Sequence, residues 1–264
     1  MNGVQDSWQA GDPYDYFMGR WSRLVARDFV QWLSPVPGLK WLDVGCGSGA
    51  LSENIIQNCQ PAELIAVDQS EGFVATAQKR LGSLAQCKVG NALALPIEAA
   101  SVNFTVSGLV LNFIAQPATA LAEMRRVTLP GGAVAVYIWD YAGQMAFLRT
   151  FWDAAVQLDP QASNLHESHR FADATDETLR ALFQRAGFVN IEAVSIEINM
   201  IFQNFDDYWQ PFLGGQGPAP SYVQHLDASA KTELRDAVYE RLPIRADGSI
   251  AMPARAWATR GEVS

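Results

Sequence analysis

Short apolar runs alternate with amphipathic segments through the first half of this chain. Helical spacing of apolar residues predicts a first helix over residues 21–33, which Pro35 ends. The runs that follow predict strands near residues 39–44, 62–67, 85–89, 102–107 and 132–139, separated by helices near residues 49–58, 71–81 and 117–127. This alternation predicts a parallel sheet with helices on both faces. Right-handed crossovers then bring the carboxyl ends of the strands to one edge, where ligands bind.

The pattern changes after Asp140. We expect a helix over residues 143–158, a polar loop, a helix from Thr175 that stops at Gly187, a long strand from Asn190 to Ile201 and a last strand near residues 249–259. The segment between these two strands is rich in aromatic residues, namely Phe202, Phe205, Tyr208, Trp209 and Phe212. We interpret it as an insertion that covers the ligand-binding edge of the sheet.

Composition is that of an ordinary globular α/β chain. With 264 residues, of which 49% are hydrophobic and 18% charged, the chain needs only one domain. We divide it into residues 1–37 (an N-terminal cover and helix), 38–140 (a ligand-binding core) and 141–264 (a cap and the last strands). A net charge of −9 argues against a nucleic-acid partner, because phosphate binding depends on clustered lysine and arginine.

Cysteine usage and hydropathy favour a cytoplasmic protein. The three cysteines are unevenly spaced and form no C-x-x-C motif, so we expect neither a disulfide framework nor a zinc site. Residues 99–122 carry no charge, but polar residues and Pro117 interrupt them, so we expect a buried strand and a loop rather than a membrane span. No basic region followed by an apolar run begins the chain, and no secretory signal is predicted.

One stretch carries most of the chemical information, the run from Trp41 to Gly49. An apolar strand containing Asp43 leads into Gly45, Gly47 and Gly49, and a helix follows. Glycines let the backbone take positive φ angles or approach a ligand closely, and a helix start offers unpaired N–H groups. The G-x-G-x-G spacing is neither the G-x-G-x-x-G of dinucleotide folds nor a phosphate loop ending in Gly-Lys-Ser/Thr.

This run resembles the first motif of the class I S-adenosylmethionine-dependent methyltransferases, and four further segments match the family in order. A second apolar strand ends at Asp68, 25 residues after Asp43, close to the roughly 20-residue spacing at which an acid meets a ribose. The other matches are the segments 88–96, 101–107 and 126–132, the last of which contains the family's Pro-Gly-Gly turn. The resemblance implies a Rossmann-like, doubly wound sheet of seven strands, mostly parallel with one antiparallel C-terminal strand, and a helical, aromatic cap over its carboxyl edge.

The resemblance also assigns roles around S-adenosylmethionine as the cofactor. Gly45, Gly47 and Gly49 would let the backbone pass its amino-acid and ribose parts, Asp43 would accept from loop N–H groups or from its ammonium, and Asp68 would accept both ribose hydroxyls. Without a ligand, the same residues would make a tight turn and a solvated strand end.

Three further positions would surround the adenine and the ammonium. Gln69 would flank the adenine. Asn91 stands where the family more often has aspartate, and its amide oxygen would accept from the adenine amino group, beside the backbone of Ala92. A backbone carbonyl near Ser107 would hold the ammonium.

Other residues would lie near the reacting methyl group or over the cofactor. Leu109, Asn112 and Phe113 would face the methyl group or, alternatively, pack in the core. The N-terminal segment would fold across the cofactor, with Tyr14 covering the sulfonium and Arg20 pairing with the carboxylate. The alternative is a surface helix with Arg20 in water.

His166 and His169 are two of the chain's three histidines, but no third ligand is visible nearby, so no metal is expected. We therefore expect transfer of a methyl group to a small-molecule acceptor, bound largely by residues 141–225, without a necessary catalytic residue. The alternatives are a non-catalytic S-adenosylmethionine-binding partner protein and a dinucleotide-dependent oxidoreductase. The attacked atom and the oligomeric state are not readable from the sequence.

Overall fold

The computed structural model describes residues 18–214 and 217–264, and its strands form one seven-stranded sheet in the order β3-β2-β1-β4-β5-β7-β6. These strands are β1 (Lys40–Val44), β2 (Glu63–Asp68), β3 (Gln86–Val89), β4 (Val102–Gly108), β5 (Thr128–Trp139), β6 (Val189–Phe202) and β7 (Ile250–Glu262). Strands β1 to β5 pair in parallel, whereas β7 is antiparallel to both β5 and β6. β7 is therefore the one reversed strand of the sheet, as predicted.

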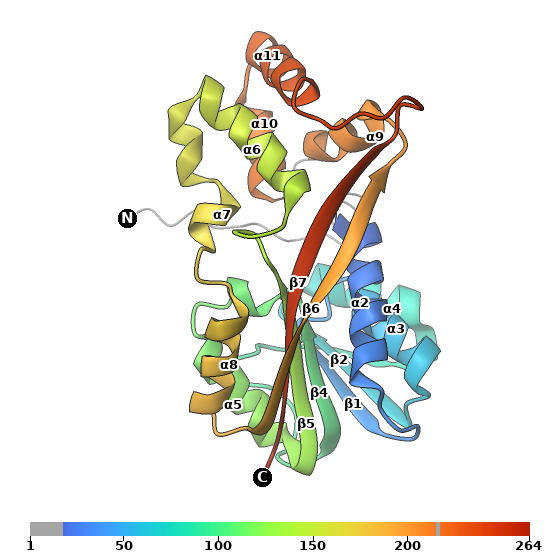
Figure 1. Ribbon diagram of the computed structural model, residues 1–264. Helices are drawn as coiled ribbons and strands as arrows, with labels where there is room; N and C mark the ends of the chain where they lie inside the picture. The colour runs from blue at the N-terminus through green and yellow to red at the C-terminus, as the bar shows by residue number, and fades with distance from the viewer. Residues whose placement is uncertain (1–17, 215–216) are drawn as a thin grey trace.

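Helices cover both faces of the sheet (Figure 1). One face is covered by α2 (Arg20–Leu33), α3 (Ala50–Cys59) and α4 (Glu71–Leu81), and the other by α5 (Pro117–Val127) and α8 (Asp176–Arg185). Successive side chains of a strand point to opposite faces. Accordingly, Trp41 packs in the hydrophobic cluster that contains residues of α2 and α3, and the next residue, Leu42, packs in the cluster beneath α5 and α8.

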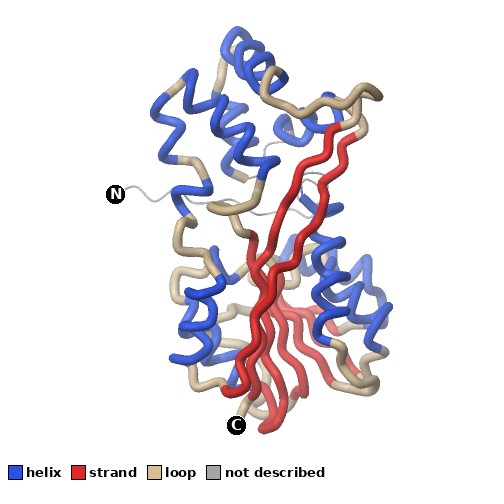
Figure 2. Tube along the Cα trace, in the orientation of Figure 1, coloured by secondary structure: helices blue, strands red, loops and turns tan. Residues whose placement is uncertain are grey.

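A helical cap stands beyond the carboxyl edge of the parallel strands (Figures 1 and 2). It is built from α6 (Ala146–Leu158), α7 (Glu167–Arg170), α9 (Phe205–Trp209), α10 (Pro218–His225) and α11 (Ala228–Tyr239), together with short 3-10 turns at Pro160–Asn164 and Gln210–Leu213. Strands β6 and β7 extend past the rest of the sheet and pair as far as Phe202 and Ile250, so they carry the cap.

Aromatic packing forms the interior of the cap. The rings of Phe151 and Phe212 stack at 4.4 Å, and Phe147 meets Tyr208 edge to face at 5.2 Å. The buried Tyr208 hydroxyl donates to the backbone carbonyl of Phe147 at 2.8 Å, which satisfies the one polar atom of that ring. The aromatic-rich segment after β6 therefore does what its composition indicated: it forms a cap over the edge of the sheet.

Element boundaries differ from the sequence prediction in one instructive place. The Pro-Gly-Gly segment was expected as a turn before β5, but the strand already begins at Thr128. Gly131 N donates to Val263 O at 2.7 Å, so pairing with the last residues of the chain continues the strand through the turn signal. Two short 3-10 turns, Gly82–Leu84 and Leu111–Phe113, complete the described elements. No helix within the described ranges is long and apolar enough to cross a membrane.

Candidate active site

The loop between β1 and α3 forms the floor of a cavity at the carboxyl edge of the sheet. Gly45, Gly47 and Gly49 have φ angles of +73°, +52° and +91°, which residues with a Cβ rarely adopt. The N–H groups of Gly45 and Cys46 both donate to Val67 O, at 2.7 and 3.0 Å, and tie the loop to β2. A Cβ added at Gly47 would meet no atom within 4 Å. The loop backbone is therefore open to a ligand at this point.

Asp68, at the end of β2, lies against this loop. Its Oδ2 accepts from Gly47 N and its Oδ1 from Ser70 N, each at 2.9 Å. Each carboxylate oxygen has room for a second bond, so these contacts orient the group without exhausting it. Burial raises the pKa of Asp68 above its usual value, against the lowering effect of those N–H donors. The side chain lines the cavity and has acceptor capacity left for hydroxyl groups.

Asp43 lies beneath the loop and is completely buried. Ser52 Oγ donates to its Oδ2 at 2.7 Å, while Oδ1 has no hydrogen-bond partner among the described residues. Burial raises the pKa of this carboxyl to about 7, and Asp68 contributes to the rise. An unsatisfied buried oxygen is costly. Asp43 therefore has an acceptor available to a donor that enters from the cavity it lines.

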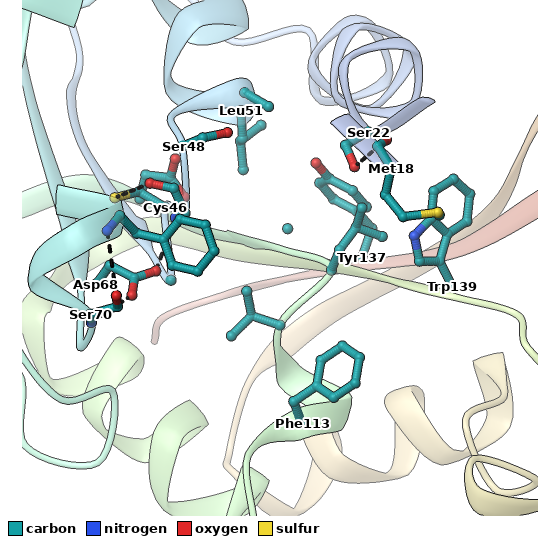
Figure 3. A pocket seen from close by; sticks show the side chains of 18 of the residues that line it. Met18, Ser22, Cys46, Ser48, Leu51, Asp68, Ser70, Phe113, Tyr137 and Trp139 are labelled. Carbon is teal, nitrogen blue, oxygen red and sulfur yellow. Dashed lines mark hydrogen bonds between the residues drawn. The ribbon is translucent and has the colours of Figure 1, made fainter. Parts of the chain in front are cut away.

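Aromatic side chains form the other half of the same cavity. In Figure 3, Asp68, Ser70 and Ser48 lie at one end, and Tyr137 and Trp139 lie at the other. Both aromatic residues point to the same side of β5, two residues apart. The cap contributes Leu148 from α6, Glu167 from α7 and Pro218 from α10 to the lining, which also includes Met18, Ser22, Phe113 and Tyr141. The cavity thus has a polar end at the glycine loop and an apolar end beneath the cap.

The end of β4 separates the two halves. Leu109, a cavity residue, is held in the left-handed region with a φ of +62°, and its N–H donates to Tyr137 O at 2.8 Å. A Cβ at Gly108 would lie 2.4 Å from Tyr137 Oη, so only glycine admits the tyrosine ring at this point. Strained backbone at a non-glycine residue is typical of functional sites.

Seven of the residues predicted from the sequence line this cavity, namely Asp43, Gly45, Gly47, Asp68, Gln69, Leu109 and Phe113. Gly49 does not line the cavity; it is the N-cap residue of α3 and has the left-handed conformation. Ser107 is buried, and its hydroxyl has no partner among the described residues. Tyr14 lies outside the described residues.

Three predicted residues have other surroundings than expected. Arg20 does not line the cavity; its Nη1 bonds both carboxylate oxygens of Asp207 on α9, at 2.9 and 3.1 Å. Asn91 Oδ1 accepts from Leu93 N at 2.9 Å and closes a local turn beside Ala92; neither Asn91 nor Ala92 lines the cavity. Such local bonds are what asparagine makes in turns.

Asn112 belongs to a second cavity, on the far side of an aromatic wall. The rings of Phe113 and Tyr141, which line the first cavity, contact Phe171, which lines the second. The two polar side-chain atoms of Asn112 are buried there with no hydrogen-bond partner among the described residues. Only Leu109 and Phe113 of the three residues expected near the methyl group therefore reach the first cavity.

The histidine pair lies in the cap, beside the cavity rather than in its lining. His166 is 5% exposed, its Nδ1 accepts from Ser168 N at 3.2 Å, and its ring stacks on that of His169 at 4.8 Å. Burial, reinforced by His169, lowers the pKa of His166, so the ring is neutral at physiological pH. The described residues hold no group of three or more potential metal ligands.

The sequence analysis missed several lining residues, because only the folded chain brings them to the cavity. Tyr137 and Trp139 were taken only as part of a strand, although their two-residue spacing on that strand indicated a shared face. Glu167, 4% exposed at the start of α7, was hidden in a segment interpreted as a polar loop. Nothing local in the sequence marks it as buried.

Comparison with known proteins agrees with this geometry. A family model described as a methyltransferase domain matches residues 42–136, which run from β1 into β5. Demethylmenaquinone methyltransferases of Staphylococcus aureus are 26% identical over 188 residues, covering 66% of this chain and 76% of theirs. These matches identify a methyltransferase domain in the chain, in agreement with the resemblance of its motifs to the class I S-adenosylmethionine-dependent methyltransferases.

Other similarities extend over more of this chain. The biotin biosynthesis bifunctional protein BioHC of Cellvibrio japonicus is 26% identical over 242 residues; the match covers 90% of this chain but only 45% of BioHC, so the chain spans about half the length of that relative. Among solved structures, a phosphoethanolamine N-methyltransferase of Haemonchus contortus in complex with S-adenosylmethionine superposes with a TM-score of 0.58 at 15% identity, covering 96% of this chain and 56% of that one.

The fold alone does not define an activity. The [4+2]-cyclase SpnF superposes with a TM-score of 0.50 at 17% identity, covering 98% of this chain and 88% of that one. The function of this protein must therefore be argued from its cavity.

Proposed function

We propose that this protein transfers the methyl group of S-adenosylmethionine to a small-molecule acceptor. One observation carries the proposal: the glycine loop with Asp68 and the aromatic residues of β5 open into a single cavity. A cavity of this kind has one end for a polar cofactor and an adjoining apolar end for an acceptor. We further propose that the core and the cap, residues 1–264 together, act as one domain.

The residues present fit S-adenosylmethionine. Asp68 would accept the ribose hydroxyls with its remaining acceptor capacity, and the open backbone at Gly47 would lie along the ligand. The unpartnered Oδ1 of Asp43 would accept from a donor of the amino-acid portion, directly or through a water. Gly45, Gln69 and Leu109 would complete the enclosure. Asn91, Ala92 and Ser107 do not line the cavity, so the fit to the cofactor does not depend on them.

When bound, the cofactor would supply an electrophilic methyl group to a nucleophilic atom of the acceptor; its sulfur would keep the electron pair of the carbon–sulfur bond, and a proton displaced from the acceptor would pass to solvent. The protein's own residues align and enclose the acceptor. Tyr137, Trp139 and Phe113 shield the apolar end from water, and the left-handed Leu109 fixes the boundary between the two ends. Alignment and exclusion of water are the main contributions expected of a protein to such a displacement.

The two other candidate functions fit less well. A dinucleotide-dependent oxidoreductase needs loop N–H groups for a pyrophosphate. Here Gly47 N is committed to Asp68, and two carboxyl groups, Asp43 and Asp68, line the cavity beside it. A non-catalytic S-adenosylmethionine-binding protein would have no use for the apolar end of the cavity.

Calorimetry with the full chain tests the proposal. S-adenosylhomocysteine should bind and raise the melting temperature, whereas NAD and NADP should not. If either dinucleotide bound more tightly than S-adenosylhomocysteine, the proposed methyltransferase function would be wrong. Acceptor-dependent release of S-adenosylhomocysteine, followed by mass spectrometry, then separates an enzyme from a non-catalytic binder.

A further inference from the structure

Every acidic or basic side chain in the described lining of the cavity is a carboxylic acid. These residues are Asp43, Asp68 and Glu167, and no lysine, arginine or histidine belongs to the described lining. Arg20, the basic residue expected from the sequence, bonds Asp207 instead. Residues 1–17 and 215–216 contain three aspartates and no lysine, arginine or histidine, so they have no positive side chain to offer. An anionic acceptor would therefore enter a buried, acidic cavity without a positive side chain to pair with, which is costly.

The acceptor end combines aromatic surfaces with one of these acids. Tyr137, Trp139 and Tyr141 supply the aromatic faces. Such faces attract cations through their negative quadrupole and stack on flat apolar groups. Glu167 reaches the same cavity from α7, on the cap, and is 4% exposed. A carboxylate accepts hydrogen bonds but donates none.

We infer that the acceptor is an uncharged or cationic molecule with a flat apolar body and an amine or hydroxyl group that donates a hydrogen bond to Glu167, and that this cavity rejects carboxylates and phosphates. Glu167 is then the residue that sets acceptor specificity. The inference rests on the proposed function, because it takes the apolar end as the acceptor site. Two observations favour it independently: the acidic lining and the aromatic walls.

A matched set of probes tests the inference on the full chain saturated with S-adenosylhomocysteine. Phenethylamine, 2-phenylethanol and 3-phenylpropanoate share a ring and a two-carbon spacer and differ in the charge of the end group. At neutral pH, calorimetry should find phenethylamine bound at least about tenfold more tightly than 3-phenylpropanoate, with 2-phenylethanol between them, because hydrogen bonds to charged groups are the strong ones. This ranking needs no variant, so it stands even if a substitution harms folding.

Substitution then assigns the ranking to one residue. In Glu167→Gln the affinity for phenethylamine should fall at least about tenfold, while 2-phenylethanol changes by less than about threefold and 3-phenylpropanoate does not weaken. Glu177→Gln, an exposed glutamate on α8, is the matched control and should keep the wild-type ranking.

Each remaining outcome counts against the inference. Undetectable binding of phenethylamine, equal affinities for the three probes, preference for 3-phenylpropanoate, or a Glu167→Gln variant with the wild-type ranking would overturn it. Binding of S-adenosylhomocysteine itself distinguishes a failure of this inference from a failure of the proposed function. If that ligand binds and the ranking is wrong, only the acceptor class is lost; if it does not bind, the proposed function is lost.

Discussion

The backbone N–H of Gly47 donates to Asp68 Oδ2 at 2.9 Å, and this bond joins the glycine loop after β1 to the end of β2. The two residues come from adjacent parallel strands, whose carboxyl ends meet at the same edge of the sheet. Asp68 thus has two functions that an experiment must separate: it holds the loop, and its remaining acceptor capacity faces the cavity.

Replacing Asp68 by alanine should weaken S-adenosylhomocysteine binding at least about tenfold, because hydrogen bonds to a charged group contribute about 1.5–3 kcal/mol. Calorimetry measures the loss. Asp68→Asn keeps an oxygen that can accept from Gly47 N and should lose less, while Asp173→Ala, at an exposed aspartate, should bind as the wild type does. An unchanged dissociation constant in folded Asp68→Ala would move the ribose site elsewhere.

The glycine loop gives a second prediction, on stability. Gly45→Ala places a Cβ in a backbone with φ of +73°, 2.7 Å from both Cγ atoms of Val110. Gly38, with φ of +81° and nothing within 4 Å of an added Cβ, is its matched control. Urea unfolding should show a cost of about 1–2 kcal/mol for Gly38→Ala from the backbone alone, and a further ~1–3 kcal/mol for Gly45→Ala from overpacking.

A double variant checks the physical cause of that difference. If contact with Val110 produces the extra cost, Val110→Ala combined with Gly45→Ala should be less destabilised than the sum of the two single variants. Additive losses would mean that the side chain of Val110 moves aside freely and that the backbone angle alone requires glycine.

Asp43 gives the protein a dependence of stability on pH. Its folded-state pKa of about 7 lies above the unfolded value of about 3.9, so the folded protein holds the extra proton between these values. The contribution to stability is fully present below the unfolded pKa and is lost as the pH rises through about 7, by roughly 1.4 kcal/mol per pH unit within that window.

Asp43→Asn removes this titration. From pH 5 to pH 8 the wild type should lose about 3 kcal/mol of unfolding free energy relative to the variant, as measured by urea unfolding at each pH. Ser52 Oγ can still donate to the asparagine oxygen, so the variant should fold. Parallel pH profiles for the two proteins would show that Asp43 does not titrate in this range.

The sequence predicted the sheet and the polar end of the cavity because their signals are local. The glycine run, Asp68 and the strand alternation each lie within a few residues, and hydrophobic periodicity records which face of a strand is buried. The acceptor end is different. Glu167 and Tyr137 approach one cavity from separate elements, and no spacing along the chain encodes that meeting.

Arg20 shows the same limit most directly. Its position beside an aromatic segment at the N-terminus indicated a cofactor contact, but its partner Asp207 lies 187 residues away, on α9 of the cap. The guanidinium also lies over the rings of Trp21 and Phe202, at 4.3 and 5.0 Å from their centres. This pairing depends on the folded sheet, because β6 and β7 place α9, which carries Asp207, beside the start of α2.

The Arg20–Asp207 pair therefore predicts a structural rather than a ligand-binding effect. The two side chains are 35% and 28% exposed, so solvent screens the pair, and a double-mutant cycle of Arg20→Ala and Asp207→Asn should give a coupling energy of about 0.5–1 kcal/mol. Neither variant should change S-adenosylhomocysteine affinity by more than about threefold, because neither residue lines the cavity. The opposite result is equally clear: if Arg20→Ala weakens that binding at least about tenfold while Asp207→Asn does not, Arg20 leaves Asp207 for the ligand carboxylate, as its sequence position indicated.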